Sequence, residues 1–177
     1  MGIVEWNFWT RASHNDHAGF YEPNDIRHCL YSAGYLNALC RLGDLVELAA
    51  FYSFVNTMGT VHIHAGRLQL TDLVKVFKLY REALPGEVLA IDAAGPALTE
   101  SHAAVDATFI RRDGVTYGFL VNLSATESAE VTLEGLGVFS RAQGITARGI
   151  LEPVTEISPT VTGTSVVLPP MSLVRIQ

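Results

Sequence analysis

The sequence contains little charge and no concentrated positive charge. Only 17% of its 177 residues are charged, compared with roughly a quarter in an average soluble domain, while 49% are hydrophobic. The formal net charge is −6, and no run of Lys and Arg interrupts the chain. A nucleic acid partner or an anionic membrane surface is therefore not expected. The shortage of charge instead predicts that some apolar surface meets another segment or chain.

A long uninterrupted hydrophobic run is also lacking. The longest apolar stretch, residues 45–58, contains Glu47 and Asn56 and is too short to cross a bilayer. We therefore expect no membrane partner. The first six residues lack the basic and apolar regions of a signal peptide, which predicts a cytoplasmic protein.

Cysteine is scarce, and the two residues present cannot form a bridge within one helix. Cys29 and Cys40 are eleven positions apart in a predicted helix. At the helical rise their Cα atoms are about 16 Å apart, whereas a disulfide requires less than about 7 Å. Two free thiols are predicted.

The first half of the chain alternates apolar runs with amphipathic segments. A short apolar run at residues 3–9 precedes a polar loop, and Asn24 or Asp25 then provides an N-cap. The expected elements are a strand at 3–9, a helix from 25 to about 43, a strand at 45–55 and a helix at 71–84. This βαβα order over residues 1–85 is typical of parallel α/β architecture.

The second half, residues 86–177, contains only short strand candidates separated by turns. They lie at 87–92, 107–112, 115–123, 130–133, 145–151, 165–168 and 173–176. Asp113-Gly114 stands between two alternating runs and predicts a tight hairpin. The pattern favours an antiparallel β-sandwich as a second domain.

Glu5 is the strongest candidate for a catalytic residue. It lies at the end of the first apolar run, and the carboxyl end of a strand is where (β/α) barrels place catalytic groups. Trp6, Phe8 and Trp9 surround it in the sequence. A carboxylate beside aromatic rings suits a sugar site, although a single Glu near Trp is more often a surface residue.

Six consecutive residues, Val4-Glu5-Trp6-Asn7-Phe8-Trp9, resemble the Asp-Glu-Trp-Asn-Val-Trp motif of glycoside hydrolase family 51, the α-L-arabinofuranosidases. The resemblance continues in register along the chain. It includes the segments 36–44, 45–56, 76–80 and 168–174, which are similar to helix seven, strand eight, helix eight and the closing strand of that family.

The resemblance implies a partial (β/α)8 barrel segment, its last two strands, followed by a jelly-roll-like β-sandwich. It also implies a retaining glycosidase that releases arabinose from poly- or oligosaccharides, with two carboxylates roughly 5 Å apart. Glu5 corresponds to the nucleophile, and Trp9 and Trp6 to substrate-binding aromatics. No cofactor and no metal are implied.

This chain departs from the family pattern in three places, the first being Val4, where the family commonly has Asp. The family's acid/base Glu belongs to an earlier strand, so we expect it to be missing from this chain. Asp16, Glu22 and Asp25 are the nearest acidic residues and suit loop or capping roles. Ser53 stands where the family often has a substrate-contacting Gln.

Two hypotheses follow for the isolated chain. Either a homo-oligomer or a second chain supplies the missing barrel strands and the acid/base, giving an active enzyme, or the chain is a non-catalytic fragment or accessory module, for example one that binds carbohydrate. Four histidines could suggest zinc: His14, His17, His62 and His64. No Cys or carboxylate is spaced to complete a zinc site, so we expect loop and strand histidines without a metal.

Overall fold

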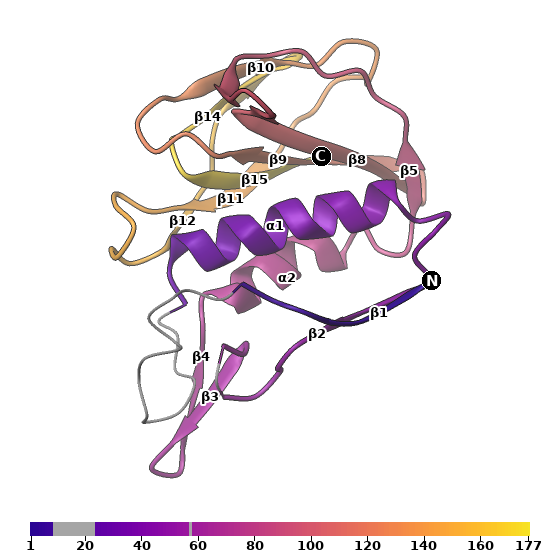
Figure 1. Ribbon diagram of the computed structural model, residues 1–177. Coiled ribbons are helices and arrows are strands. Elements are labelled where there is room, and N and C mark those ends of the chain that lie inside the picture. Colours follow the sequence, from indigo (N-terminus) through magenta and orange to yellow (C-terminus); the bar gives the residue numbers. More distant parts are fainter. Residues whose placement is uncertain (9–23, 57) are drawn as a thin grey trace.

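The computed structural model describes residues 1–8, 24–56 and 58–177. Most of its elements form four layers: a two-stranded parallel sheet, a pair of helices, a six-stranded sheet and a three-stranded sheet (Figure 1). Two further two-stranded sheets are hairpins. In chain order the elements are β1 (Gly2–Trp6), α1 (Ile26–Arg41), β2 (Leu48–Phe51), β3 (Val61–His64), β4 (Arg67–Leu70), α2 (Leu73–Arg81), β5 (Glu87–Leu89), β6 (Ala97–Thr99), β7 (His102–Ala103), β8 (Val105–Arg112), β9 (Val115–Asn122), β10 (Ala129–Thr132), β11 (Ala142–Thr146), β12 (Thr155–Ile157), β13 (Val161–Thr162), β14 (Ser165–Leu168) and β15 (Ser172–Ile176).

The first layer is a parallel pair of strands connected through a helix. β1 and β2 pair in parallel, and α1 forms the crossover between them, as the βαβ pattern predicts. Asp25 caps α1 by accepting a hydrogen bond from the Arg27 amide at 2.9 Å. The helix ends at Arg41, so both of its predicted limits are confirmed within two residues.

The six-stranded sheet has the order β12-β11-β15-β9-β8-β5, and all its pairs are antiparallel. Both faces of this sheet are covered by other elements. Successive residues of a strand point to opposite faces, so each strand contributes side chains to two cores. Phe119 and Val121 of β9 face a core shared with α1 and α2. Leu120 between them faces a core shared with the three-stranded sheet β10-β14-β13.

A buried polar network fixes the two helices to the six-stranded sheet. Asn37 of α1 donates to Asp106 Oδ2 of β8 at 2.7 Å and accepts from the Tyr80 hydroxyl of α2 at 2.7 Å. Arg41 forms an ion pair with Asp106 at 2.9 Å. Tyr80 also stacks on Phe119, with ring centroids 4.0 Å apart. Helices and sheet therefore form one packed unit.

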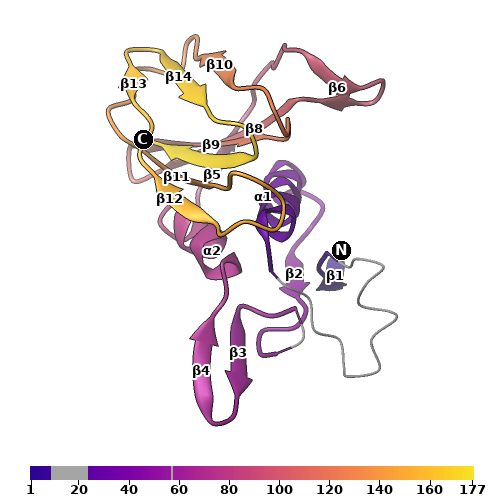
Figure 2. The same cartoon turned by 90° about the vertical axis from the view of Figure 1, so that its left-hand side faces the viewer.

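Two hairpin turns each place two consecutive residues at positive φ. Asp113 and Gly114 both have positive φ, 51° and 79°, in the β8–β9 hairpin, as the Asp-Gly signal predicts. Ala65 and Gly66, at 48° and 73°, make an equivalent turn between β3 and β4. The sequence predicts no strand between the strand at 45–55 and the helix at 71–84, so the β3–β4 hairpin is a correction. It projects away from the other elements (Figure 2).

The predicted strand at 45–55 is also shorter than expected, since β2 covers only Leu48–Phe51. The helix predicted to reach Leu84 ends at Arg81, and Leu84 is partly exposed instead of buried. Both cysteines are free thiols of α1, as predicted. In the described part of the chain, no helix is both long and apolar enough to cross a membrane.

Candidate functional site

Glu5 lies at a bulge near the carboxyl end of β1. Ile3 pairs with Ala49 and Trp6 with Phe51, so two residues, Val4 and Glu5, stand opposite one residue of β2. A bulge bends its strand and changes the direction of a side chain, and bulges are common beside active sites. Val4 and Glu5 are both exposed. Within the described residues the Glu5 carboxylate has no hydrogen-bond or ion-pair partner, and it is therefore free to meet a ligand.

Asn7 holds the segment after Glu5 against the segment after β2. Its side-chain amide donates to the carbonyl oxygens of Tyr52 and Met58, the latter at 3.2 Å. Its Oδ1 accepts from the Phe8 amide at 2.7 Å. Asn7 is buried, so these bonds replace water contacts that the amide would otherwise lack. The two strand ends are thereby fixed next to each other, which keeps the Glu5 backbone in place.

The residues that follow β2 bring aromatic side chains to the same edge. The strands are parallel, so their carboxyl ends meet on one side, and Tyr52 and Phe54 are 41% and 66% exposed there. The sequence interpretation did not single them out; their position directly after the second apolar run was the available signal. Ser53, where the family often has Gln, donates to Val55 O at 3.1 Å and so closes a local turn.

Trp6 occupies the opposite side of β1 from the exposed residues. Its ring is only 6% exposed, stacks on Tyr35 of α1 at 4.7 Å and meets Phe51 edge-on at 5.0 Å. Phe77 of α2 lies 6.4 Å away. This burial is at odds with the expected contact between Trp6 and a substrate, because the helices already cover the ring. The role of Trp6 in this structure is to pack β1 against the helices.

Four further residues of the sequence analysis are Trp9, Asp16, Glu22 and Asp25. The first three lie outside the described residues. Asp25 has the capping role expected for it, since its Oδ1 accepts a hydrogen bond from the Arg27 amide at 2.9 Å. It also pairs with the Arg27 guanidinium at 2.6 Å and lies 3.3 Å from His28. Desolvation raises its pKa, but hydrogen bonds from Arg27 and the charges of His28 and Arg27 outweigh it, so the pKa is below the ordinary value. An ionised cap is a poor proton donor.

The histidines of β3 do not form a metal centre with other described residues. His62 and His64 share the polar face of the β3–β4 hairpin with Gln69 and Arg67, their cross-strand partners. No group of three or more His, Cys, Asp or Glu side chains in the described ranges could hold a metal ion. The chemistry of the edge around Glu5 is that of a carboxylate beside aromatic rings.

The sequence model of the alpha-L-arabinofuranosidase C-terminal domain matches residues 5–172. This chain belongs to that family. The match begins at Glu5 and extends through the helices and both sheets, so it includes nearly all of the fold described above. No curated protein sequence matches the chain.

Solved family 51 enzymes have the same fold over 99% of this chain. The arabinofuranosidase of Xanthomonas axonopodis pv. citri has a TM-score of 0.84 at 23% identity, with 40% of its own chain covered. The Thermotoga maritima enzyme, solved with arabinose, has a TM-score of 0.81 at 21% identity and 42% coverage. AbfB of Bifidobacterium longum has a TM-score of 0.84 at 16% identity and 42% coverage.

This chain thus spans about two fifths of the length of these enzymes. Its mostly β structure with few helices corresponds to their C-terminal portion. Family membership makes it part of a glycoside hydrolase family.

Proposed function

We propose that this chain supplies the nucleophile to a retaining α-L-arabinofuranosidase that releases arabinose from arabinose-containing poly- or oligosaccharides. The observation that carries the proposal is the position of Glu5. It is an exposed carboxylate at a bulge, at the carboxyl end of a strand whose neighbour is parallel. Such strand ends are where barrel enzymes hold catalytic groups.

In this proposal residues 1–85 form the last two strand–helix units of a (β/α)8 barrel, and residues 86–177 form a β-sandwich domain. The two-stranded sheet supports this assignment. In the described structure β1 and β2 pair only with each other, so each strand has one unpaired edge. Val4 and Leu48 are 81% and 61% exposed. Six further strands, from another segment or chain, would pair these edges and cover this apolar surface.

The reaction requires two carboxylates on one sugar. Glu5 would attack the anomeric carbon, so that a glycosyl ester forms and the bond to the leaving oxygen breaks. A second carboxylic acid, supplied by the added strands, would protonate that oxygen and then take a proton from the water that hydrolyses the ester. Trp9 would form an aromatic wall for the sugar. Trp6 and Asn7 would hold Glu5 in position from the side away from the sugar.

The test is hydrolysis of a chromogenic α-L-arabinofuranoside by the chain alone and by the chain mixed with a polypeptide of the remaining barrel strands. Glu5→Gln is compared with Glu47→Gln, which changes an exposed carboxylate just before β2. We expect turnover in the mixture to fall roughly a thousandfold or more for Glu5→Gln and to stay unchanged for Glu47→Gln. Azide should restore turnover to Glu5→Ala, since it can replace the missing nucleophile. Full activity of Glu5→Gln would reject the assignment.

The alternative is a non-catalytic fragment or an accessory module of such an enzyme. The six-stranded and three-stranded sheets pack in two cores, whereas the two-stranded sheet β1–β2 has unpaired edges. This difference favours the non-catalytic alternative. Absence of turnover in every mixture, from protein whose unfolding remains cooperative, would support this alternative over an active enzyme.

A further inference from the structure

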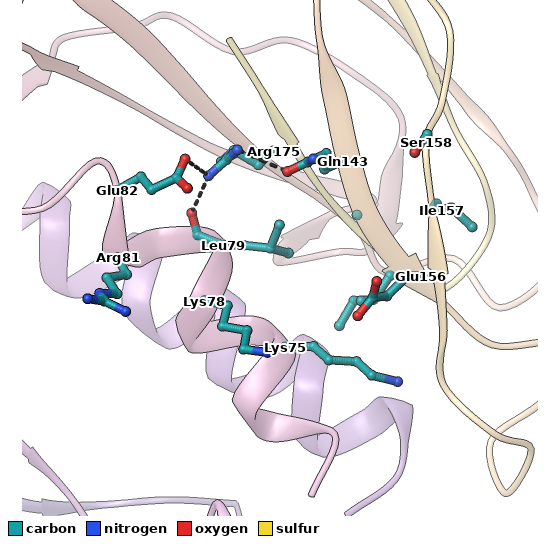
Figure 3. Close-up of a pocket in the computed structure, with 12 residues that line it drawn as sticks. Lys75, Lys78, Leu79, Arg81, Glu82, Gln143, Glu156, Ile157, Ser158 and Arg175 are labelled. Atoms are coloured by element: carbon teal, nitrogen blue, oxygen red, sulfur yellow. Dashed lines mark hydrogen bonds and ion pairs between the residues drawn. The ribbon is translucent and has the colours of Figure 1, made fainter. Parts of the chain in front are cut away.

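A groove lies between α2 and the strands β11, β12 and β15 (Figure 3). Its volume is about 740 Å³, within the range of roughly 300–1,000 Å³ typical of small-molecule sites. Four of the chain's 12 Lys and Arg residues line it, together with two carboxylates, Glu82 and Glu156. The groove therefore carries excess positive charge in a chain whose net charge is −6.

Arg175 is the fixed cation of this groove. Its side chain is 7% exposed, and its guanidinium bonds Glu82 at 2.6 Å, Gln143 at 3.0 Å and the Leu79 carbonyl at 3.4 Å. Tyr117 lies under the guanidinium, 5.8 Å from ring centroid to Cζ. These contacts hold the guanidinium in the wall of the groove, so Arg175 is not the cation left over for a ligand.

The remaining charges divide into engaged and free groups. Lys75 is engaged, since it pairs with Asp72 at 2.8 Å and donates to the Val154 carbonyl at 2.7 Å. Lys78 and Arg81, one helical turn apart on α2, have no partner within the described structure. Glu156 of β12 is also free there. Two free cations against one free carboxylate leave one positive charge for a ligand.

We propose that this groove binds an oligosaccharide that carries a carboxylate, such as one with a uronic acid residue. Either Lys78 or Arg81 would pair with the carboxylate, while hydroxyls would bond Glu156, Gln143 and Ser158. Gln143 and Ser158 can both donate and accept hydrogen bonds, and the Glu156 carboxylate accepts them, so together they suit a hydroxyl-rich ligand better than a simple inorganic anion. The choice of a carbohydrate rests on the proposed function. An enzyme that acts on a polysaccharide binds it more tightly when a second site contacts the same polysaccharide.

The experiment is isothermal titration of the full chain at low salt with two probes. One is a xylo-oligosaccharide bearing one glucuronic acid residue, and the other is the same compound with its carboxyl group reduced to an alcohol. We expect the acidic probe to bind roughly fivefold more tightly, an advantage that raised salt removes. The double variant Lys78→Gln/Arg81→Gln should lose this preference. Arg141→Gln/Arg148→Gln removes the same charge from exposed positions outside the groove and should keep it.

Three results would overturn the inference: equal binding of the two probes, loss of the preference in the control double variant, or tighter binding of a Glu-rich hexapeptide than of the acidic probe. Glu5→Gln separates this inference from the proposed function. The groove should keep its affinity in that variant, whereas hydrolysis should not survive. Retained hydrolysis without groove binding would reject only the groove, and retained binding without hydrolysis in any mixture would reject only the enzyme.

Discussion

The two halves of the molecule differ in how much apolar surface they leave uncovered. Nineteen large apolar side chains are exposed in the described residues, and thirteen of them belong to residues 1–85. The sheets of residues 86–177 bury their apolar residues in two cores, one against the helices and one between the sheets. Among the described elements, helices cover one face of the sheet β1–β2. The same chain thus contains one region whose large sheet is packed on both faces and a second region, β1–β2, whose sheet has unpaired edges in the described structure.

This difference indicates where the structure tolerates substitution. Side chains of the two cores cannot change without a cavity or an unpaired polar group. Side chains on the open face of β1 and β2, such as Val4 and Leu48, are 81% and 61% exposed and so lose few contacts when they are changed. The comparison therefore predicts large effects of mutation in the shared cores and small effects near Glu5, which is the reverse of what a complete barrel would show.

The largest effect is expected for Phe119→Ala. Phe119 is fully buried and stacks on Tyr80, so its removal leaves a cavity between α2 and the six-stranded sheet. We expect a loss of about 3–5 kcal/mol in the free energy of unfolding, measured by urea denaturation. Phe54→Ala is the matched control, because Phe54 is 66% exposed, and should cost little. Equal losses for the two variants would contradict the predicted difference between the buried core and the exposed surface.

A smaller loss is expected for the polar network between the helices and the sheet. Asn37→Ala removes the donor to Asp106 and the acceptor of Tyr80, so buried groups lose their partners. A decrease of about 1–3 kcal/mol in unfolding free energy is expected. Tyr80→Phe completes a double-mutant cycle with it, and a coupling energy of about 1 kcal/mol should appear. Strictly additive losses would show that the two side chains act separately.

The cap of α1 should contribute less, and its contribution should depend on pH. Asp25→Ala is expected to cost about 1 kcal/mol, whereas Asp25→Asn keeps a capping oxygen and should cost less. The pKa of Asp25 is lowered in the folded chain from its ordinary value of 3.8. The carboxylate therefore stabilises the fold above about pH 4, and this stabilisation is lost as the pH falls through the lower folded pKa. Urea denaturation between pH 7 and pH 2 should show the gap to Asp25→Asn closing; a constant gap would contradict the ionised cap.

Local sequence signals predicted the elements whose cause is local. Asp25 and the helical spacing of Ile26, Cys29 and Ala33 specify α1, and all three apolar residues are fully buried as that spacing predicts. The β3–β4 hairpin was missed although its signal is local as well. Ala65-Gly66 separates two alternating runs, but Ala is an unusual residue at positive φ, so the turn was not recognised.

The site depended on interactions that no local pattern contains. The bulge that exposes Glu5 exists only in the register between β1 and β2, which lie more than forty residues apart. Trp6 was expected at a sugar, yet the aromatic side chains of two later segments cover its ring. A motif can therefore indicate which residue carries chemistry without indicating which neighbours face the ligand.

The smallest effect is expected for Val4→Thr, which tests the open face directly. Val4 is 81% exposed on β1, so an added hydroxyl stays in water and the unfolding free energy should change by less than about 0.5 kcal/mol. Val174→Thr, at a fully buried position of β15, places the same hydroxyl in a core and should cost about 1–3 kcal/mol. If further strands cover β1, Val4→Thr should also weaken their association, measured by titration of the barrel polypeptide with the variant chain. Unchanged association would mean that the surface around Glu5 remains open when those strands bind, and that the barrel does not close over it.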